Sequence, residues 1–334
     1  ANLDAYFSEE ELSAYVDAFI EEGRLPDGGL YVFPIAKSTE ILYLNQTLFD
    51  EFAAATGANA KQLSTFEGIA ALARQYYEWT DGLTPDISGD GKDFFAADAW
   101  FNVAEAGMEQ LGGSLFDGGA LNLDSDTYAH IFETFYTPAV EGGIAIYSGY
   151  SSDLSKTGDI VCSTGSSAGI LFYGDTITYA DATVKQVEYS ILPYPVFEGG
   201  EKLALQRGGG LMVAKSNEKK EYAAAQFIKW LTAPELNMEF ISETGYLPVT
   251  KQAFEQNMQT HLESVADARV KKMLTVVLGM YGEYRFITAP NLPNLDEISR
   301  RYEEDWHYLL TKNRREFLSG NRIPAANALA EFKN

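Results

Sequence analysis

The chain has 334 residues, which is enough to bury a full core and usually forms two domains. Hydrophobic residues make up 46% of the chain and charged residues 22%, a composition typical of a globular protein rather than a disordered tail. The formal net charge of −23 argues against nucleic-acid binding and against a basic membrane-binding patch, and it disfavours a polyanionic ligand.

The single cysteine, Cys162, cannot form an internal disulfide, and its apolar neighbours predict a small core residue. No run of the sequence approaches the roughly 20 apolar residues of a membrane helix. No signal peptide or lipidation site is visible, but the chain begins within a stretch typical of a folded domain, as expected of a processed or trimmed sequence. The missing leader is therefore no evidence for a cytoplasmic protein.

The first 45 residues predict one helix and two strands. Ser8 and Glu11 form a capping box, which starts a helix that we expect to reach about Glu22. Two apolar runs follow, over Leu30–Ile35 and Ile41–Asn45, and each has the length of a strand.

Amphipathic helices are expected over Asn45–Gly57 and Ser64–Thr80, the second opened by a capping box of Ser64 and Glu67. A third helical pattern spans 94–111 and contains Trp100. We expect the helix that follows it to start at Asp124 or Ser125 and to reach Val140.

A loop rich in aspartate and glycine follows the second of these helices. Asp86, Ser88 and Asp90 have the one, three, five spacing of a calcium loop, and Gly91 has the position of its sharp turn. The bidentate glutamate of such a loop is absent, because Ala97 occupies position twelve. A plain turn is favoured and a calcium site stays open; no other cofactor is indicated.

The segment after Cys162 predicts a strand that runs into a loop of serines and glycines and then opens a helix. Such a loop directs backbone N–H groups and hydroxyls at one place. Gly165–Gly169 also carries the G-x-S-x-G pattern through Ser167, which alone is a weak indication of a serine hydrolase. The histidines lie in helical contexts without an obvious acidic partner: His130, His261 and His307.

Residues 208–250 form a run of successive elements. Gly208–Gly210 let the backbone turn or approach a neighbour closely, and Leu211–Ala214 reads as a short buried strand. Ser216 or Asn217 caps a helix whose apolar face repeats at helical spacing. That face consists of Ala224, Phe227, Ile228 and Leu231.

A second helix of this run is expected from Pro234, with Thr232 as a candidate cap and Gly245 at its end. An extended piece over Tyr246–Val249 closes the run.

These motifs, in this order, resemble the extracellular solute-binding proteins of ABC importers, in the large sugar-binding family. The resemblance is strongest to the glycerol-phosphate-binding branch, which shares the Thr-Gly-Tyr-Leu-Pro sequence. The matching segments are Gly208–Val213, Phe227–Leu231, Pro234-Glu235 and Thr244–Val249.

The resemblance implies an α/β, two-lobed fold of the periplasmic-binding-protein-like type II, with strands exchanged between lobes and ligand held between them. Residues 1–36 plus 208–283 would form the first lobe, and 37–207 plus 284–334 the second. Family chains carry further N-terminal βα units before the segment that matches Tyr31–Asn45. The sequence is therefore expected to be a fragment that lacks part of the first lobe and of its ligand site.

The resemblance also implies a set of ligand-binding residues. An aromatic residue, here Trp100, would stack on the ligand, and Ser166 and Ser167 match a Ser-Ser pair of the glycerol-phosphate branch. Asp296 stands where that branch carries an anion-binding arginine, which favours a neutral, hydroxylated ligand. The full set is Trp100, Ser166, Ser167, Gly209, Tyr246, Arg285 and Asp296.

Structural roles for these residues stay open beside the binding roles. Trp100 and Tyr246 can be packing residues, and Ser166 and Ser167 can be helix caps. Arg285 and Arg207 are the remaining candidates for holding an anion.

The function implied is a binding protein without catalytic residues. It would capture a carbohydrate and deliver it to the transmembrane subunits of an ABC permease. We expect an extracellular or periplasmic monomer, anchored as a cell-surface lipoprotein. The alternatives are a glycerol-3-phosphate or phosphodiester binder, a serine hydrolase using Ser167, and an adhesion module. The sequence does not name the sugar.

Overall fold

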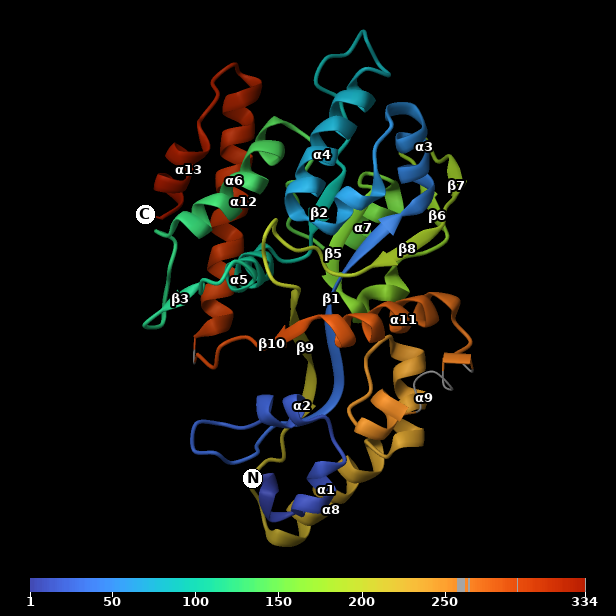
Figure 1. The fold of residues 1–334 in the computed structure, drawn as a ribbon, viewed down its shortest axis with the longest axis vertical. Coiled ribbons are helices and arrows are strands. Elements are labelled where there is room, and N and C mark those ends of the chain that lie inside the picture. Colours follow the sequence, from blue (N-terminus) through green and yellow to red (C-terminus); the bar gives the residue numbers. More distant parts are fainter. Residues whose placement is uncertain (257–261, 264, 293, 334) are drawn as a thin grey trace. The chain divides into compact units, whose positions relative to one another are not determined.

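The computed structural model describes residues 1–256, 262–263, 265–292 and 294–333. The chain divides into two compact units (Figure 1). The first unit contains Ala1–Glu40, Ser166–Leu171 and Gln206–Gly279. The second contains Ile41–Gly165, Phe172–Leu205 and Met280–Asn334. No helix among the described residues is long and apolar enough to cross a membrane.

The boundaries of the units differ from the lobes expected from the sequence at several places. Residues 37–40 and 206–207 belong to the first unit, because Thr39 pairs with Gln206 in a β-ladder there. The short segment Ser166–Leu171 also belongs to the first unit, where Ser167 Oγ accepts the N–H of Thr39.

The first unit is mostly helical and includes the first part of β1 (Phe33–Asn45) and the last part of β9 (Leu203–Leu211). Its other elements are η1 (Leu3–Ala5), α1 (Glu9–Ser13), α2 (Asp17–Glu22), η3 (Ser167–Phe172), α8 (Glu218–Leu231), α9 (Pro234–Thr244), the π-helical turn η4 (Gln252–Gln256) and most of α11 (Ala268–Glu283).

The strand pairing in the first unit corrects the predicted positions of two strands. The glycines 208–210 lie inside β9, which ends at Leu211, so the strand predicted over Leu211–Ala214 is wrong. β9 runs antiparallel to β1, and Gly208 pairs with Lys37. A Cβ at Gly208 would lie 2.3 Å from the carbonyl oxygen of Ala36. The close-approach interpretation is therefore confirmed for Gly208 and Gly210 but not for Gly209, and no turn forms there.

The capping box at the N-terminus is confirmed, but the helix that it opens is short. Ser8 Oγ accepts the N–H of Glu11, and α1 ends at Ser13. The chain then breaks the helix to pair with another segment, because Val16 donates its N–H to the carbonyl of Val249 at 3.0 Å. The single helix expected up to Glu22 is thus two helices.

Helices α8 and α9 begin and end close to their predicted positions. Asn217 caps α8, and Gly245 ends α9 in the left-handed conformation. Thr232 does not cap α9, since its hydroxyl donates back to the carbonyl of Ile228 in the last turn of α8. The apolar face predicted on α8 is wrong in part, because Phe227 is 51% exposed.

The second unit contains a sheet with helices around it (Figure 1). It holds the second part of β1 and the first part of β9. Its helices are α3 (Gln46–Thr56), η2 (Ala60–Ser64), α4 (Phe66–Asp81), α5 (Trp100–Gln110), α6 (Asp126–Glu141), α7 (Ser151–Thr157), α12 (Leu295–Leu318) and α13 (Ala325–Phe332). Its further strands are β2 (Phe95–Ala97), β3 (Phe116–Asp117), β4 (Ala120–Leu121), β5 (Cys162–Ser166), β6 (Thr176–Thr178), β7 (Val184–Gln186), β8 (Tyr189–Leu192) and β10 (Arg285–Ile287).

Parallel and antiparallel pairs both occur in this unit. β2 runs parallel to β5, and β10 runs parallel to the first part of β9. β8 pairs antiparallel with the second part of β1. β1 is one continuous strand of 13 residues that runs through both units, whereas the sequence predicted two strands. The α/β class and the exchange of strands between two units agree with the expected fold.

Helix ends in the second unit follow local sequence signals. Asn45 caps α3, and Gly57 ends it in the left-handed conformation, so the helix expected over Asn45–Gly57 is confirmed. Thr65 rather than Ser64 caps α4, accepting the N–H of Gly68. The helix predicted over 94–111 is the strand β2 followed by α5, because Phe95 pairs with Cys162 in the sheet.

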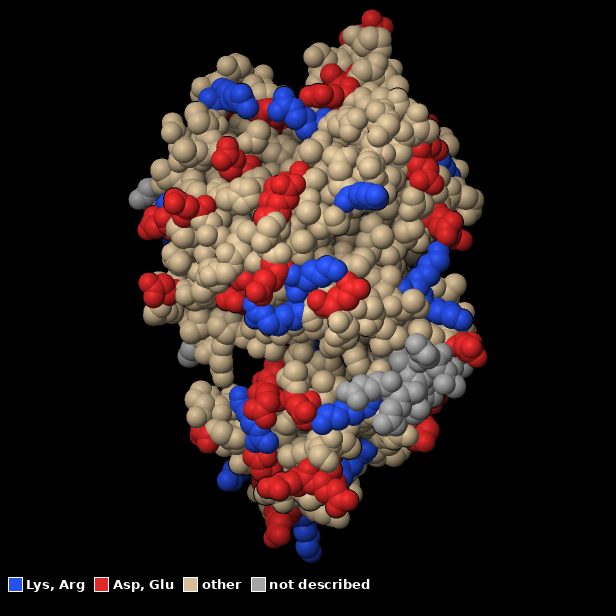
Figure 2. Space-filling model, in the orientation of Figure 1, with Lys and Arg blue, Asp and Glu red and all other residues tan. Residues whose placement is uncertain are grey.

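Helices α5, α6, α12 and α13 pack on one another and enclose an aromatic core (Figure 1). The Trp306 ring contacts those of Phe132 and Phe332, with centroids 4.9 and 5.6 Å apart. On the face shown in Figure 2, acidic and basic side chains are interspersed.

Candidate functional site

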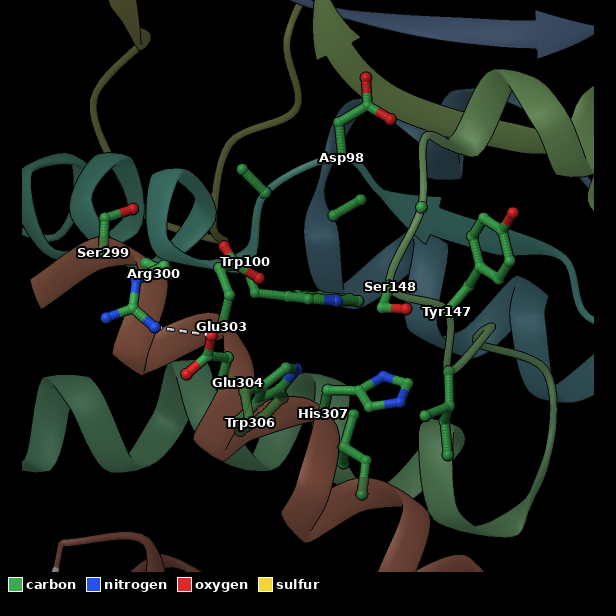
Figure 3. A pocket seen from close by; sticks show the side chains of 15 residues that line it. Asp98, Trp100, Tyr147, Ser148, Ser299, Arg300, Glu303, Glu304, Trp306 and His307 are labelled. Atoms are coloured by element: carbon green, nitrogen blue, oxygen red, sulfur yellow. Dashed lines mark hydrogen bonds and ion pairs between the residues drawn. The ribbon is translucent and has the colours of Figure 1, made fainter. Parts of the chain in front are cut away.

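The candidate site is a cavity of about 540 Å³ within the second unit. Three segments bound it: the start of α5 with the residues before it, the loop 146–149, and one face of α12 (Figure 3). Its aromatic and charged or titratable lining side chains are Asp98, Trp100, Tyr147, Arg300, Glu303, Glu304, Trp306 and His307.

Trp100 is the first residue of α5 and is the predicted ligand-binding residue that lines this cavity. Its side chain is largely buried, and its ring packs against Phe135 and Trp306 at centroid distances of 5.0 and 5.9 Å. The two roles that the sequence left open, core packing and ligand contact, are both compatible with this position.

Glu303 on α12 caps the N-terminus of α5 from outside that helix. The N-cap residue of α5 is Ala99, which has no side-chain acceptor. The Glu303 carboxylate supplies one instead and accepts the N–H of Phe101 at 2.7 Å. Burial raises the pKa of the Glu303 carboxyl to about 7, although hydrogen bonds from the N–H groups of Phe101 and Trp100 lower it. This carboxyl therefore changes its charge near neutral pH.

Trp306 lines the cavity and carries a buried hydrogen-bond donor. Its side chain is 3% exposed and stands among the cavity-lining residues of α12 (Figure 3). The indole Nε1 has no hydrogen-bond partner among the residues that the structure describes. A buried N–H without a partner costs on the order of 1–3 kcal/mol, so a ligand that carries an acceptor oxygen would recover this energy.

The remaining polar side chains of the cavity are paired or partly exposed. Asp98 accepts the N–H and the hydroxyl of Ser151 at 2.7 and 2.6 Å. Arg300 forms an ion pair of 2.8 Å with Glu304, drawn in Figure 3. The Tyr147 side chain is 42% exposed and lies on the loop side of the cavity.

Four of the predicted ligand residues lie in the first unit: Ser166, Ser167, Gly209 and Tyr246. The Tyr246 ring is stacked on Phe240. Gly209 has open space where a side chain would stand. Ser166 Oγ accepts the N–H of Ala168 at 3.3 Å.

Ser167 is fully buried in the first unit, and its Oγ accepts the N–H of Thr39 at 3.2 Å. This hydrogen bond gives Ser167 a structural role. A hydrolytic nucleophile needs an accessible hydroxyl beside a general base. The geometry of Ser167 therefore offers no support for the hydrolase alternative.

The other two predicted residues lie in the second unit but do not line the cavity. Arg285 begins β10 and pairs with Glu201 at 3.4 Å, with both side chains more than half exposed. Asp296 is an exposed residue in the first turn of α12, where a negative charge favours the helix dipole.

The predicted calcium loop follows α4. Asp86, Ser88 and Asp90 are all exposed. The Thr84 hydroxyl donates to Asp90 at 2.6 Å, and Asp81 accepts the N–H of Asp90. Across the described part of the chain, no three His, Cys, Asp or Glu side chains are grouped to hold a metal ion. The calcium site stays a prediction, and a melting temperature insensitive to EDTA would argue against it.

Sequence reasoning did not find Glu303, Trp306 or Tyr147. Trp306 lies at helical spacing from the buried Tyr302 and Leu309, which is the pattern of a core residue. The sequence feature that could have pointed to this site is the concentration of Trp, His and Glu residues along α12. That feature alone does not tell which of these residues face α5.

Comparison with known proteins gives the family. A profile of the bacterial extracellular solute-binding proteins matches residues 2–266. The chain belongs to this family. The resemblance inferred from the sequence is thereby confirmed, and the family is extracellular by description.

Two relatives of this solute-binding protein are periplasmic proteins named for binding sn-glycerol-3-phosphate. UgpB of Rhizobium meliloti (strain 1021) is 26% identical over 261 residues, covering 74% of this chain and 56% of the relative. UgpB of Brucella abortus (strain 2308) is 24% identical over 302 residues, covering 86% of this chain and 64% of the relative. The chain thus spans about three fifths of the length of these relatives.

Solved structures of solute-binding proteins share the fold. The cyclic alpha-maltosyl-1,6-maltose binding protein from Arthrobacter globiformis matches with a TM-score of 0.71 at 18% identity, over 99% of this chain and 77% of the other. UgpB from Mycobacterium tuberculosis in complex with glycerophosphocholine matches with a TM-score of 0.69 at 19% identity, over 100% and 77%. The expected two-lobed fold is confirmed by these matches.

Proposed function

We propose that this solute-binding protein captures a carbohydrate outside the cell and delivers it to the transmembrane subunits of an ABC permease. Family membership supports the binding role, and the neighbour from Arthrobacter globiformis, which is named for a cyclic maltosaccharide, supports a carbohydrate. The observation that carries the proposal is the cavity of the second unit, which is lined by aromatic rings and includes Trp306, whose buried N–H has no partner among the described residues.

The chemistry of this cavity suits a hydroxylated ligand. A sugar or polyol presents C–H groups, which pack on aromatic rings such as those of Trp100 and Tyr147. Its hydroxyls can accept from the Trp306 N–H and donate to the Glu303 carboxylate. Both kinds of partner are within one cavity, so a single ligand can use them together.

No covalent step is part of this function. Ligand favours the conformer that binds it most tightly, and a permease that recognises this conformer would distinguish loaded from empty protein. We infer a monomer held at the cell surface by a lipid anchor. Binding, rather than catalysis, is the role of each residue assigned above.

The proposal is tested by isothermal titration calorimetry of the full chain with maltose, ribitol, sorbitol and glycerol-3-phosphate. We expect heat of binding with a neutral sugar or polyol. A ligand at 100 times its dissociation constant should also stabilise the protein by about 2.7 kcal/mol. A panel without any binding would overturn the proposal.

A second candidate, glycerol-3-phosphate, is favoured by the names of the two UgpB relatives. The carboxylates of the cavity disfavour a phosphate there, since like charges repel. This candidate therefore needs a cationic site elsewhere, for which Arg285 and Arg207 are the predicted residues. Charge reversal at each arginine should abolish binding of glycerol-3-phosphate, and survival of its affinity in both variants would exclude this ligand.

A further inference from the structure

The charged side chains of the cavity are unequally divided between the two signs. Asp98, Glu303 and Glu304 bring three carboxylates, whereas Arg300 brings one guanidinium. Arg300 is already paired with Glu304 at 2.8 Å. Asp98 is satisfied by the N–H and hydroxyl of Ser151. Of the three carboxylates, that of Glu303 forms no ion pair with any Lys or Arg side chain in the part of the chain that the structure describes.

Glu303 keeps the capacity to accept a further hydrogen bond. A carboxylate offers about four acceptor positions on two oxygens. The structure uses some of them for the N–H groups of Phe101 and Trp100 at the start of α5. Burial raises the pKa of this carboxyl to about 7. The hydrogen bonds from α5 therefore do not fully offset the cost of burying its negative charge in the free protein. A protonated amine placed beside it would supply that compensation.

Glu303 shares its surroundings with several other titratable and charged side chains. On α12, Arg300, Glu304 and His307 line the same cavity; across it stand Asp98 and the phenol of Tyr147. Beneath them, the Tyr128 hydroxyl from α6 pairs with that of Tyr302, and burial raises the pKa of both phenols far above neutral pH. Among these groups, Glu303 is the carboxyl that also contacts the start of α5.

The aromatic side chains of the cavity also favour a cation. Trp100, Trp306 and Tyr147 place three electron-rich rings on the lining. A cation close to such rings gains electrostatic energy, and this gain grows as water is excluded. Trp100 and Trp306 are both more than nine-tenths buried. Their rings therefore provide the poorly hydrated surroundings in which this attraction is strongest.

The unpaired N–H of Trp306 defines a second requirement. This group only donates, so it needs an oxygen acceptor, which an ammonium does not provide. A ligand that satisfies both Glu303 and Trp306 must carry an amine and a hydroxyl or ether oxygen.

We propose that the cavity selects a hydroxylated primary amine, of the amino-sugar or amino-polyol class, with its ammonium on Glu303 and one oxygen on Nε1 of Trp306. This inference rests on the proposed function and narrows its ligand class. The proposed amine differs from the neutral ligand that the sequence led us to expect. The proposal depends on Glu303 and Trp306, which the sequence alone did not place in one cavity with Trp100.

The test compares two matched ligands, 1-amino-1-deoxy-D-sorbitol and D-sorbitol, by calorimetry on the full chain at pH 6 and pH 8. The amine should bind at least tenfold more tightly than sorbitol at pH 8. Its affinity should rise about tenfold from pH 6 to pH 8, because binding requires Glu303 to lose a proton that it holds with a pKa of about 7. The affinity of sorbitol should change little over this range.

Two variants test whether Glu303 causes the preference for the amine over sorbitol. Glu303→Gln keeps an acceptor oxygen for α5 but removes the charge, and it should reduce the preference for the amine to less than about twofold. Glu297→Gln makes the same change at an exposed position of α12 outside the cavity and should keep the preference. Circular dichroism of each variant verifies its fold.

The outcomes separate this inference from the proposed function. Sorbitol binding as tightly as the amine would leave the carbohydrate-binding role standing and overturn the amine preference. Binding of neither ligand, nor of any sugar in the calorimetric panel, would overturn both. An amine preference that persists in Glu303→Gln would exclude Glu303 as the group that recognises the cation.

Discussion

The carboxylate of Glu303 accepts the backbone N–H of Phe101 at 2.7 Å, across 202 positions of sequence. This hydrogen bond joins α12 to the start of α5 and places a titratable group inside the cavity. The Glu303 side chain thus contributes both to the stability of the second unit, by capping α5, and to the charge of the cavity.

The first prediction concerns the pH dependence of stability. The pKa of Glu303 is raised from 4.5 to about 7 by burial, so between these pH values the folded state keeps a proton that the unfolded chain has lost. Stability therefore falls as pH rises through this range, by on the order of 3 kcal/mol. Glu303→Gln should lose this part of the pH dependence in urea denaturation at pH 5 and pH 8. Identical pH profiles for wild type and variant would contradict the assignment.

Trp306→Phe tests the unpaired indole N–H. The variant keeps an aromatic ring in the core but removes the donor, so we expect affinity for a hydroxylated ligand to fall about three- to tenfold, the worth of one hydrogen bond. Trp79→Phe, on α4 and outside the cavity, is the matched control and should keep full affinity. Unchanged affinity in Trp306→Phe would show that ligand does not use this N–H.

Gly208→Ala tests the close approach of β9 to β1. Gly208 has φ +119°, and an added Cβ would meet the backbone of Ala36 and Lys37. We expect a loss of at least about 2 kcal/mol in the free energy of unfolding. Gly209→Ala is the control, because its Cβ would enter open space, and it should stay within about 1 kcal/mol of wild type. Equal stabilities of the two variants would contradict the pairing described.

Ser167→Ala separates a structural role from a catalytic or ligand-binding one. The variant leaves the buried N–H of Thr39 without this acceptor, which should lower stability by about 1–3 kcal/mol. We expect no turnover of activated esters by wild type or variant. Esterase activity that disappears in Ser167→Ala would revive the hydrolase alternative. A loss of ligand affinity without loss of stability would instead support the ligand role predicted from the sequence.

Local signals allowed much of the fold to be predicted. The caps Asn45 and Asn217 and the helix-ending glycines Gly57 and Gly245 act within a few residues, so short patterns contain the information. The continuity of β1 and the break after α1 were missed, because pairing with distant segments decides both. Propensity and periodicity do not report such pairing.

The candidate site was less accessible to sequence reasoning. Trp100 was found through the family resemblance, whereas Glu303 and Trp306 were not, since their roles depend on how α12 packs against α5. A buried tryptophan at helical spacing is normally a core residue, and only the coordinates show that its N–H has no partner among the described residues. The acidic lining likewise arises from two segments that are distant in the sequence, the residues before α5 and one face of α12.

The central claim, that the cavity of the second unit binds a hydroxylated ligand, is tested most directly by calorimetry on Tyr147→Ala. Tyr147 lines the cavity and is 42% exposed, so its loss should barely affect the fold. Tyr308→Ala, at a 67% exposed position of α12 outside the cavity, is the control. We predict that Tyr147→Ala weakens binding of the best ligand at least tenfold and that Tyr308→Ala does not. Wild-type affinity in Tyr147→Ala would contradict the account and move the ligand site away from this cavity.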